Sequence, residues 1–229
     1  MTALAGRLAL VTGASRGIGA ATAEALRDAG ARVVRVARTL QPAPGYVDLP
    51  ADLASLDQLD ALAARLASVG VPDVVVSNAG GFLLRPLEQT ELADVDAQLA
   101  INLRAPFALA RTLLPRMRAA GRGGCFIWVG SVADHVGLPE NAAYAASKYG
   151  LRGLHETLLA EYRGSGVRLT LISPGPTDTP MWDPVDPDHR EGFPPRARML
   201  RPADVADAVL FVATRPPHVL IDWLRLGPN

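Results

Sequence analysis

Cysteine is nearly absent from this sequence, which has one, Cys125, among 229 residues. A lone cysteine excludes an intrachain disulfide and is typical of a reducing compartment, so we expect a cytoplasmic protein. Cys125 lies in the apolar run 125–129, which predicts a buried structural thiol. The residues before the first predicted strand, at 8–12, contain no basic segment followed by a long apolar stretch, so we expect no signal peptide.

Long apolar runs and an excess of one charge are also missing. No apolar run approaches about 18 residues, so we expect no membrane-spanning helix. The 23 basic residues balance 23 acidic ones, which argues against nucleic acid or an acidic membrane surface as a partner. Hydrophobic residues make up 49% and charged residues 20%, the composition of an ordinary globular protein. No motif predicts a metal site.

Lysine is the scarcest charged residue, because Lys148 is the single lysine among the 23 basic residues. It follows Tyr144 by four positions, so on a helix the two side chains share one face. An ammonium group is compact and its pKa is tunable, whereas a guanidinium is a broad fork that stays protonated. A positive charge nearby lowers the pKa of a phenol and turns it into a usable proton donor and acceptor. The alternative is that one lysine survived by chance in an arginine-biased sequence.

Short β-branched runs alternate with longer amphipathic segments along the whole sequence. This alternation is typical of β-α units on a parallel sheet. We therefore predict an α/β fold, a single domain over residues 1–229, with about seven parallel strands and helices on both faces. A proline-rich segment at about 176–201 is the one long irregular stretch, and we predict that it is a lid. The predicted strands are 8–12, 32–37, 46–48, 74–77, 125–129, 168–172 and 219–226, and the predicted helices are 17–29, 55–68, 91–119, 142–163 and 202–214.

A glycine-rich loop directly follows the first predicted strand. Its glycines, Gly13, Gly17 and Gly19, permit a tight turn, close approach to a pyrophosphate and close packing of helix on strand. The next helix presents free N–H groups at its N-terminus to the phosphates. The loop therefore predicts a doubly wound Rossmann domain that binds a dinucleotide, and the alternative is a merely tight turn.

The end of the second predicted strand indicates which dinucleotide is bound. A fold that prefers NAD usually has an acidic residue there for the ribose 2′-hydroxyl, but this strand ends in Ala37 and Arg38. Arg38 and Arg16 can hold a 2′-phosphate through charge-assisted hydrogen bonds, so we predict NADP(H). The alternative for Arg38 is a solvated charge at the strand end. Asp52 and Leu53, after the third strand, are predicted to flank the adenine.

Several further motifs complete one pattern. Residues 77–80 are Ser-Asn-Ala-Gly, Asn102 lies in a predicted helix, Ser131 precedes Tyr144 by 13 positions, and Pro-Gly at 174–175 follows the sixth strand. With these residues in place, the sequence resembles the short-chain dehydrogenase/reductase family in its ordinary, non-extended form. The resemblance covers nearly the whole chain. It implies an oxidoreductase that transfers a hydride between a nicotinamide and a carbonyl or alcohol carbon.

The resemblance also implies a role for each residue at the reacting end. Tyr144 exchanges a proton with the substrate oxygen, and Ser131 binds that oxygen. Lys148 lowers the pKa of Tyr144 and binds the nicotinamide ribose, and Asn102 holds a water that links Lys148 to solvent. Besides Tyr144 and Lys148, the residues implied to bind the cofactor are Gly13, Ser15, Arg16, Gly17, Ile18, Gly19, Arg38, Asp52, Leu53, Asn78, Ala79, Gly80, Pro174, Gly175, Thr177 and Thr179.

The substrate is only partly predictable. We expect His135 and Val136, and Met181 and Trp182 of the lid, to contact a small or medium, partly apolar carbonyl or alcohol substrate. For His135 a solvated loop position is the alternative. A reductase of 3-oxoacyl thioesters on an acyl carrier protein is the alternative function, and a non-catalytic NADP sensor is a third.

The two helices predicted around 103–119 and 142–163 have apolar residues on more than one face. Excess apolar surface on a helix indicates burial by a partner. Members of the family that the sequence resembles pair through these helices. We therefore expect a homodimer or a homotetramer.

Overall fold

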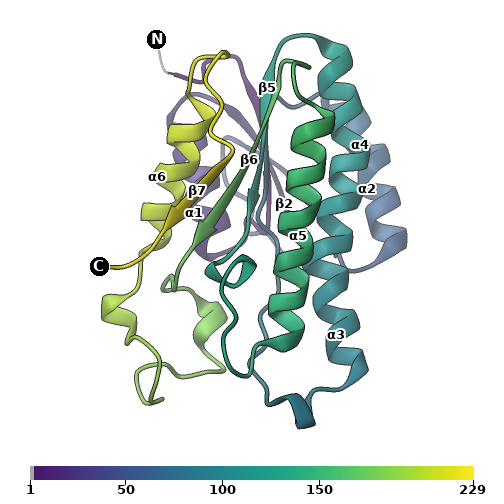
Figure 1. Ribbon diagram of the computed structural model, residues 1–229. Helices are drawn as coiled ribbons and strands as arrows, with labels where there is room; N and C mark the ends of the chain where they lie inside the picture. The colour runs from purple at the N-terminus through teal and green to yellow at the C-terminus, as the bar shows by residue number, and fades with distance from the viewer. Residues whose placement is uncertain (1–2) are drawn as a thin grey trace.

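The computed structural model describes residues 3–229, and the strands of this part of the chain form one seven-stranded parallel sheet (Figure 1). The strand order is β3-β2-β1-β4-β5-β6-β7. The order reverses between β1 and β4, so the chain builds the sheet outward from its centre in two directions. The strands are β1 (Leu8–Thr12), β2 (Arg32–Ala37), β3 (Tyr46–Pro50), β4 (Val74–Ser77), β5 (Gly124–Val129), β6 (Val167–Pro174) and β7 (Trp223–Leu226).

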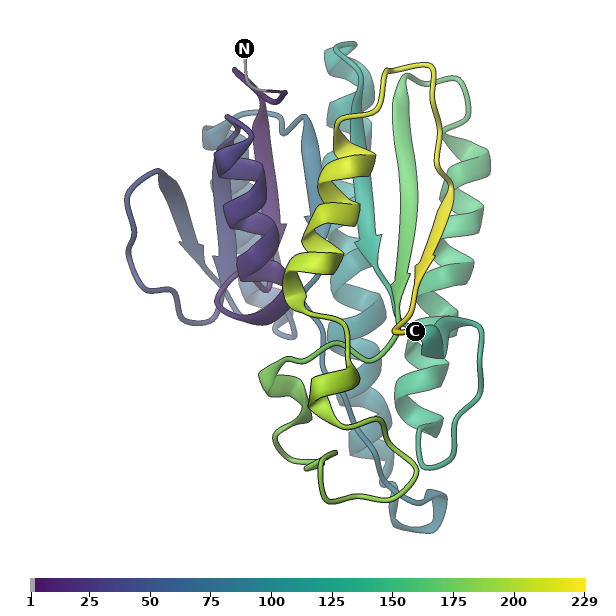
Figure 2. The ribbon, with the colours of Figure 1, turned by 90° about the vertical axis from the view of Figure 1, so that its left-hand side faces the viewer.

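Helices cover both faces of the sheet, as Figures 1 and 2 show. A strand covered on both faces must be apolar in both directions, and every residue of β1 is buried. A shorter helix, α3 (Leu92–Leu99), extends beyond the sheet in line with α4. One face carries α1 (Gly17–Asp28) and α6 (Pro202–Ala213), and the other carries α2 (Leu56–Val69), α4 (Ala105–Ala120) and α5 (Ala142–Glu161).

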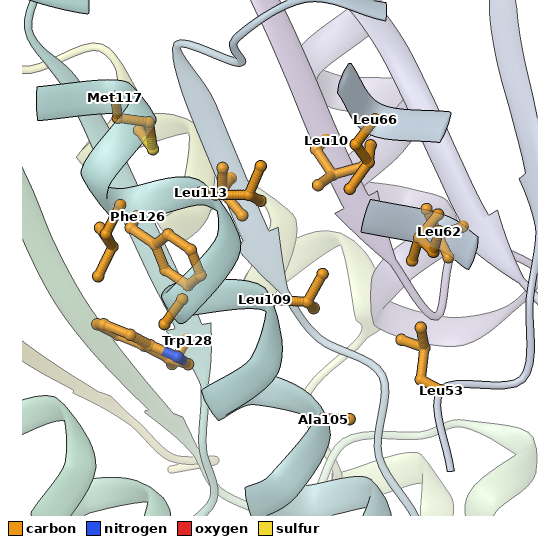
Figure 3. Close-up of a cluster of buried hydrophobic side chains, with 14 of the residues drawn as sticks. Leu10, Leu53, Leu62, Leu66, Ala105, Leu109, Leu113, Met117, Phe126 and Trp128 are labelled. Carbon is orange, nitrogen blue, oxygen red and sulfur yellow. The ribbon is translucent and has the colours of Figure 1, made fainter. Parts of the chain in front are cut away.

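The core between the sheet and α4 fixes the central strands (Figure 3). Leu109, Leu113 and Met117 recur every four residues on α4, so they share one face of that helix. They pack in one cluster with Phe126 and Trp128 of β5, both of which are fully buried. This packing holds the carboxyl ends of the central strands, and the loops that follow them, in fixed positions.

No helix in residues 3–229 has the length and apolar character needed to cross a membrane.

The strands at 8–12, 32–37 and 74–77 are confirmed to the residue. The helical stretch predicted over 91–119 is helical from 92 to 120, but a π-helical turn, Ala100–Arg104, lies between α3 and α4, which the sequence did not predict. A π turn is rare and often marks a functional position. Here the π turn carries Asn102, whose side chain is buried.

The strand predicted over 219–226 is also shorter than expected and begins at Trp223. Side chains of β6 donate hydrogen bonds to backbone carbonyl oxygens of the residues before Trp223. Arg168 donates to the Val219 oxygen at 3.3 Å, and Thr170 donates to the Ile221 oxygen at 2.6 Å. Residues 219–222 therefore lie beside β6 without forming a strand. The predicted lid at 176–201 is irregular apart from two short 3-10 turns, Pro180–Trp182 and Arg196–Arg198.

The carboxyl ends of all seven parallel strands lie at one edge of the sheet. In Figures 1 and 2 this is the lower edge, where the loop after β4 and the long loop after β6 extend below the sheet. Open α/β sheets bind their ligands in the crevice at this edge, where the strand order reverses. The site is therefore expected among the loops that follow β1, β4, β5 and β6.

Candidate functional site

A cavity of about 590 Å³ lies at this edge of the sheet. Its volume is in the range of small-molecule sites, roughly 300–1,000 Å³. Ser131, Tyr144 and Lys148 line it together, although they come from the end of β5 and from α5. Asn78 and Thr179 line its other side, so residues from the glycine-loop side and the lid meet there.

The glycine loop leaves no room for side chains at its closest points. A Cβ on Gly19 would lie 2.2 Å from the Gly13 oxygen, and one on Gly13 would lie 2.8 Å from the Ala79 Cα. Asn78 holds the loop from the next strand, since its Nδ2 donates to the Thr12 oxygen at 2.9 Å. No side chain caps the N-terminus of α1, so its first N–H groups remain available to an anion.

Two cations lie near this loop without partners. Arg16 and Arg38 are exposed, and within residues 3–229 neither makes an ion pair. Arg35 differs from these two residues. It lies on β2, the strand that ends just before Arg38, and two hydrogen bonds of 2.8 Å join its guanidinium to the Asp48 carboxylate. The exposed pair is therefore free to bind phosphate oxygens.

The two residues predicted to flank the adenine have local structural contacts. The carboxylate of Asp52 accepts a hydrogen bond from the Ala54 nitrogen at 3.0 Å, which closes the turn after β3. Leu53 is 3% exposed and belongs to the hydrophobic core. Their contact with an adenine stays a prediction.

The start of the lid lies against the glycine loop. The Thr179 methyl group would be 3.1 Å from a Cβ placed on Gly17. Thr177 is buried, and its hydroxyl donates to the Gly175 oxygen at 3.0 Å, which fixes the turn after Pro174. The lid therefore packs against the glycine loop at Gly17, whereas Asn78 contacts that loop at Gly13 and Gly19.

Asn102 connects the loop after β4 to α5. Its Oδ1 accepts from the Gly81 nitrogen at 3.0 Å, and its Nδ2 lies 3.0 Å from the Gly81 oxygen and from the Ser147 hydroxyl. Ser147 in turn donates to the Tyr144 carbonyl oxygen at 2.6 Å. The π turn thus places one amide where it holds both the glycine-rich segment after β4 and the helix that carries Tyr144.

Tyr144 is held as a neutral phenol. Its side chain is nearly buried, and burial raises its pKa to about 12 because the phenolate would lose its hydration. The neighbouring Ser131 hydroxyl lowers the pKa, and the negative charge of Asp134 raises it further. Tyr144 therefore carries its proton at neutral pH, as a proton donor must.

Lys148 is 5% exposed and makes one protein hydrogen bond, from Nζ to the Val129 oxygen at 3.3 Å. Burial lowers its pKa to about 8, and the charge of Asp134 opposes that shift. Nζ lies 5.6 Å from the centroid of the Tyr144 ring. Burial raises the pKa of Tyr144, and the group that lowers this pKa is Ser131, so the lowering that the sequence predicted from Lys148 stays a prediction. Two further Nζ donors remain for a ligand.

Asp134 is a residue that the sequence analysis missed. It is fully buried, and its Oδ2 accepts from the Ser131 nitrogen at 3.1 Å and the Ser173 hydroxyl at 2.6 Å. Trp223 donates to the same Ser173 hydroxyl at 2.8 Å. The carboxylate therefore anchors the backbone of Ser131 at the start of a short 3-10 turn. The spacing of Ser131 and Asp134, which is that of a capping box, is the signal that could have revealed it.

Two predicted substrate contacts do not reach the cavity. His135 is turned away, because its Nδ1 is 2.7 Å from the Asp134 Oδ1 and its ring meets Trp223 edge-on at 5.2 Å. Val136 is 39% exposed and lies outside the cavity lining. Met181 and Trp182 do line it. Phe82, Leu84, Leu138 and Phe193 line it as well.

Comparisons with known proteins agree with this geometry. A model of the family described as short chain dehydrogenase matches residues 7–190. A curated relative, a D-threitol dehydrogenase of Mycolicibacterium smegmatis, is 36% identical, with 92% of this chain and 87% of the relative covered.

Solved structures are similar over nearly their whole length. A metagenomic short-chain oxidoreductase in complex with NADP is 35% identical with a TM-score of 0.81, covering 99% of both chains. A 3-oxoacyl (acyl-carrier-protein) reductase from Agrobacterium tumefaciens with NADP bound is 27% identical with a TM-score of 0.83, covering 97% of this chain and 93% of the other. The strand order, the glycine loop and the grouped Ser131, Tyr144 and Lys148 fit the family that the sequence resembles. The chain belongs to the short-chain dehydrogenase/reductase family of oxidoreductases.

Proposed function

We propose that this protein is an NADP(H)-dependent oxidoreductase that interconverts a carbonyl group and an alcohol. The observation that carries the proposal is the meeting of Ser131, Tyr144 and Lys148 in one cavity, beside the glycine loop. A bound nicotinamide supplies or accepts the hydride. The protein must then position the substrate carbon and move one proton to or from its oxygen.

The dinucleotide fits the residues that are present. The backbone at Gly19 and Gly13 lies so close to neighbouring protein atoms that no Cβ fits, as the tight turn of a pyrophosphate-binding loop requires, and the N-terminus of α1 is uncapped. Arg16 and Arg38 are exposed cations, which suit the additional phosphate of NADP. Relatives solved with NADP support this choice.

The proton chemistry follows from the burial of Tyr144. In the reducing direction its hydroxyl donates a proton to the substrate oxygen, while Ser131 donates a hydrogen bond that keeps this oxygen within reach. Lys148 binds the ribose hydroxyls with its free donors, and its charge offsets the phenolate that forms. Asn102 holds α5 and the loop after β4 together, so Tyr144 and Lys148 of α5 keep their positions relative to that loop. We keep the water-holding role of Asn102 as part of the proposal.

The cofactor assignment is tested by the affinities for NADPH and NADH. We expect NADPH to bind at least about tenfold more tightly, because each charged hydrogen bond to the 2′-phosphate contributes about 1.5–3 kcal/mol. Arg38→Ala should remove most of that preference, whereas Arg163→Ala, an exposed arginine just beyond α5, should leave it unchanged. Equal affinities of the unmodified protein for the two cofactors would refute the NADP assignment.

Reduction of the 3-oxo group of an acyl-carrier thioester is the second candidate, favoured by one solved relative. It requires a basic surface around the mouth of the site. Arg196 of the lid is paired with Asp178 at 2.8 Å and Asp183 at 2.6 Å, so it contributes little to such a surface. The substrate panel below, extended to acyl thioesters and followed by NADPH absorbance, separates the two.

We also propose that the protein is a homodimer or homotetramer that pairs through α4 and α5. Phe107 on α4 is 51% exposed and Tyr149 on α5 is 45% exposed, which leaves apolar surface on both helices. Sedimentation velocity of the purified protein measures the assembly. A monomer at all concentrations would rule it out.

A further inference from the structure

Aromatic rings from separate segments wall the outer part of the cavity. Phe82 comes from the loop after β4, and Trp182 and Phe193 come from the lid. The Phe82 ring meets Tyr144 edge-on, with centroids 4.9 Å apart and planes at 88°. It meets Trp182 at 5.1 Å, and Trp182 meets Phe193 at 5.9 Å. These three residues, the aromatic wall, run without a break from the proton donor to the lid.

The charged groups beside the aromatic wall are paired with each other. The guanidinium of Arg190 donates to the Glu140 carboxylate and lies over the Phe193 ring, 5.1 Å from its centroid. The Glu140 carbonyl oxygen accepts from the Arg85 nitrogen at 2.7 Å, and Glu140 has a left-handed φ of 59°. This residue therefore ties together the three loops around the cavity, and Arg190 and Glu140 neutralise each other there.

The remaining lining offers few polar partners beyond the reacting groups. Leu84, Leu138 and Met181 are apolar. The main polar exception is Asn141, which is 2% exposed and whose Oδ1 has no hydrogen-bond partner within residues 3–229. Glu191, the other charged residue there, is exposed to solvent. A polyhydroxylated substrate would lose more hydrogen bonds to water than these few groups could replace, which is unfavourable. An apolar ring would gain contact with the aromatic wall.

We infer that the substrate is a ketone, or the matching secondary alcohol, whose reacting carbon is attached to an apolar ring, aromatic or alicyclic. This inference rests on the proposed function and names its substrate class. In the reducing direction the carbonyl π bond breaks, the carbon accepts a hydride from the reduced nicotinamide, and the oxygen accepts the Tyr144 proton. The products are the alcohol, the oxidised nicotinamide and the Tyr144 phenolate, which regains its proton from solvent, so two electrons and one proton are transferred and the reaction balances. The alternative, a polyol, is the substrate in the name of one relative.

The test compares kcat/KM for matched ketones with NADPH: acetophenone, cyclohexyl methyl ketone, a four-carbon ketose and acetoacetate. We expect both ring ketones to exceed the ketose and the charged acid by at least about tenfold. Phe82→Leu should lower kcat/KM for acetophenone by about tenfold, mainly through KM, with NADPH affinity unchanged. Phe211→Leu, on an exposed phenylalanine of α6, is the matched control and should change neither.

The possible outcomes separate a failure of the substrate inference from a failure of the proposed oxidoreductase function. If the ketose or acetoacetate is reduced as well as the ring ketones, or better, the inference is wrong and the oxidoreductase function stands. If Phe82→Leu leaves the KM for acetophenone unchanged, the aromatic wall does not select the substrate. If no ketone is reduced with NADPH and no matching alcohol is oxidised with NADP, the proposed function itself fails.

Discussion

Replacing Lys148 with methionine is expected to stabilise the ligand-free protein at neutral pH, although it removes a group that the proposed reaction needs. Burial lowers the pKa of Lys148 from 10.5 to about 8. At about 1.4 kcal/mol per pKa unit, the buried ammonium destabilises the fold by about 3 kcal/mol relative to a neutral amine. Methionine keeps an unbranched apolar stem. It loses the hydrogen bond to the Val129 oxygen, worth about 1 kcal/mol, so a net gain of about 2 kcal/mol remains.

The pH dependence of this gain identifies its cause. The folded pKa of Lys148 lies below the unfolded value, so the unfolded state binds more protons between about pH 8 and pH 10.5. The unmodified protein therefore recovers stability with rising pH in that window, and the advantage of Lys148→Met falls to about 1 kcal/mol at about pH 9 and vanishes near about pH 10.

The assay is urea unfolding of both proteins without cofactor, at a fixed protein concentration, from neutral pH to about pH 9. Groups shared by the two proteins cancel in the difference between their free energies of unfolding. Arg163→Met is the control at an exposed site and should change the free energy by less than about 0.5 kcal/mol. A Lys148→Met variant that is no more stable at neutral pH, or whose difference is constant with pH, would refute the desolvation argument.

Two further substitutions test the compactness of the site. Lys148→Arg keeps the charge but brings a wider fork into a buried position, so NADPH-dependent turnover should be close to zero; near-normal turnover would show that compactness is irrelevant. Gly19→Ala should weaken dinucleotide binding more than about tenfold in a fluorescence titration and lower Tm, because the new Cβ would lie 2.2 Å from the Gly13 oxygen. A Cβ on Gly153 of α5 would have no atom within 4 Å, so Gly153→Ala should bind the dinucleotide normally and gain about 1 kcal/mol of stability. Equal behaviour of the two glycine variants would contradict the close approach of the Gly19 and Gly13 backbones.

The strands were predictable where local sequence decides the structure. The run Val74–Ser77 is apolar on both faces, and only a central parallel strand accommodates that pattern. Asn102 shows the limit, since apolar periodicity runs through its position without a break. The π turn there depends on hydrogen bonds to Gly81 and Ser147, which the fold brings close from distant parts of the chain.

The reacting groups were predictable because a motif fixes their spacing, but their surroundings were not. The structure brings Ser131, Tyr144 and Lys148 into one cavity, as their family spacing implied. No spacing marks Phe82, whose position depends on a lid that is remote in sequence. His135 was predicted to face the substrate from its place after Ser131 alone, and its contacts with Asp134 and Trp223 turn it away.

The most direct test of the central claim is NADPH-dependent reduction of a ring ketone by Tyr144→Phe. Removing one hydroxyl group takes away the proposed proton donor and leaves a ring of the same shape. We predict that kcat falls by about 10²–10⁴-fold while NADPH affinity is unchanged. Turnover near that of the unmodified enzyme would show that Tyr144 does not transfer the proton, and the proposed mechanism would be wrong.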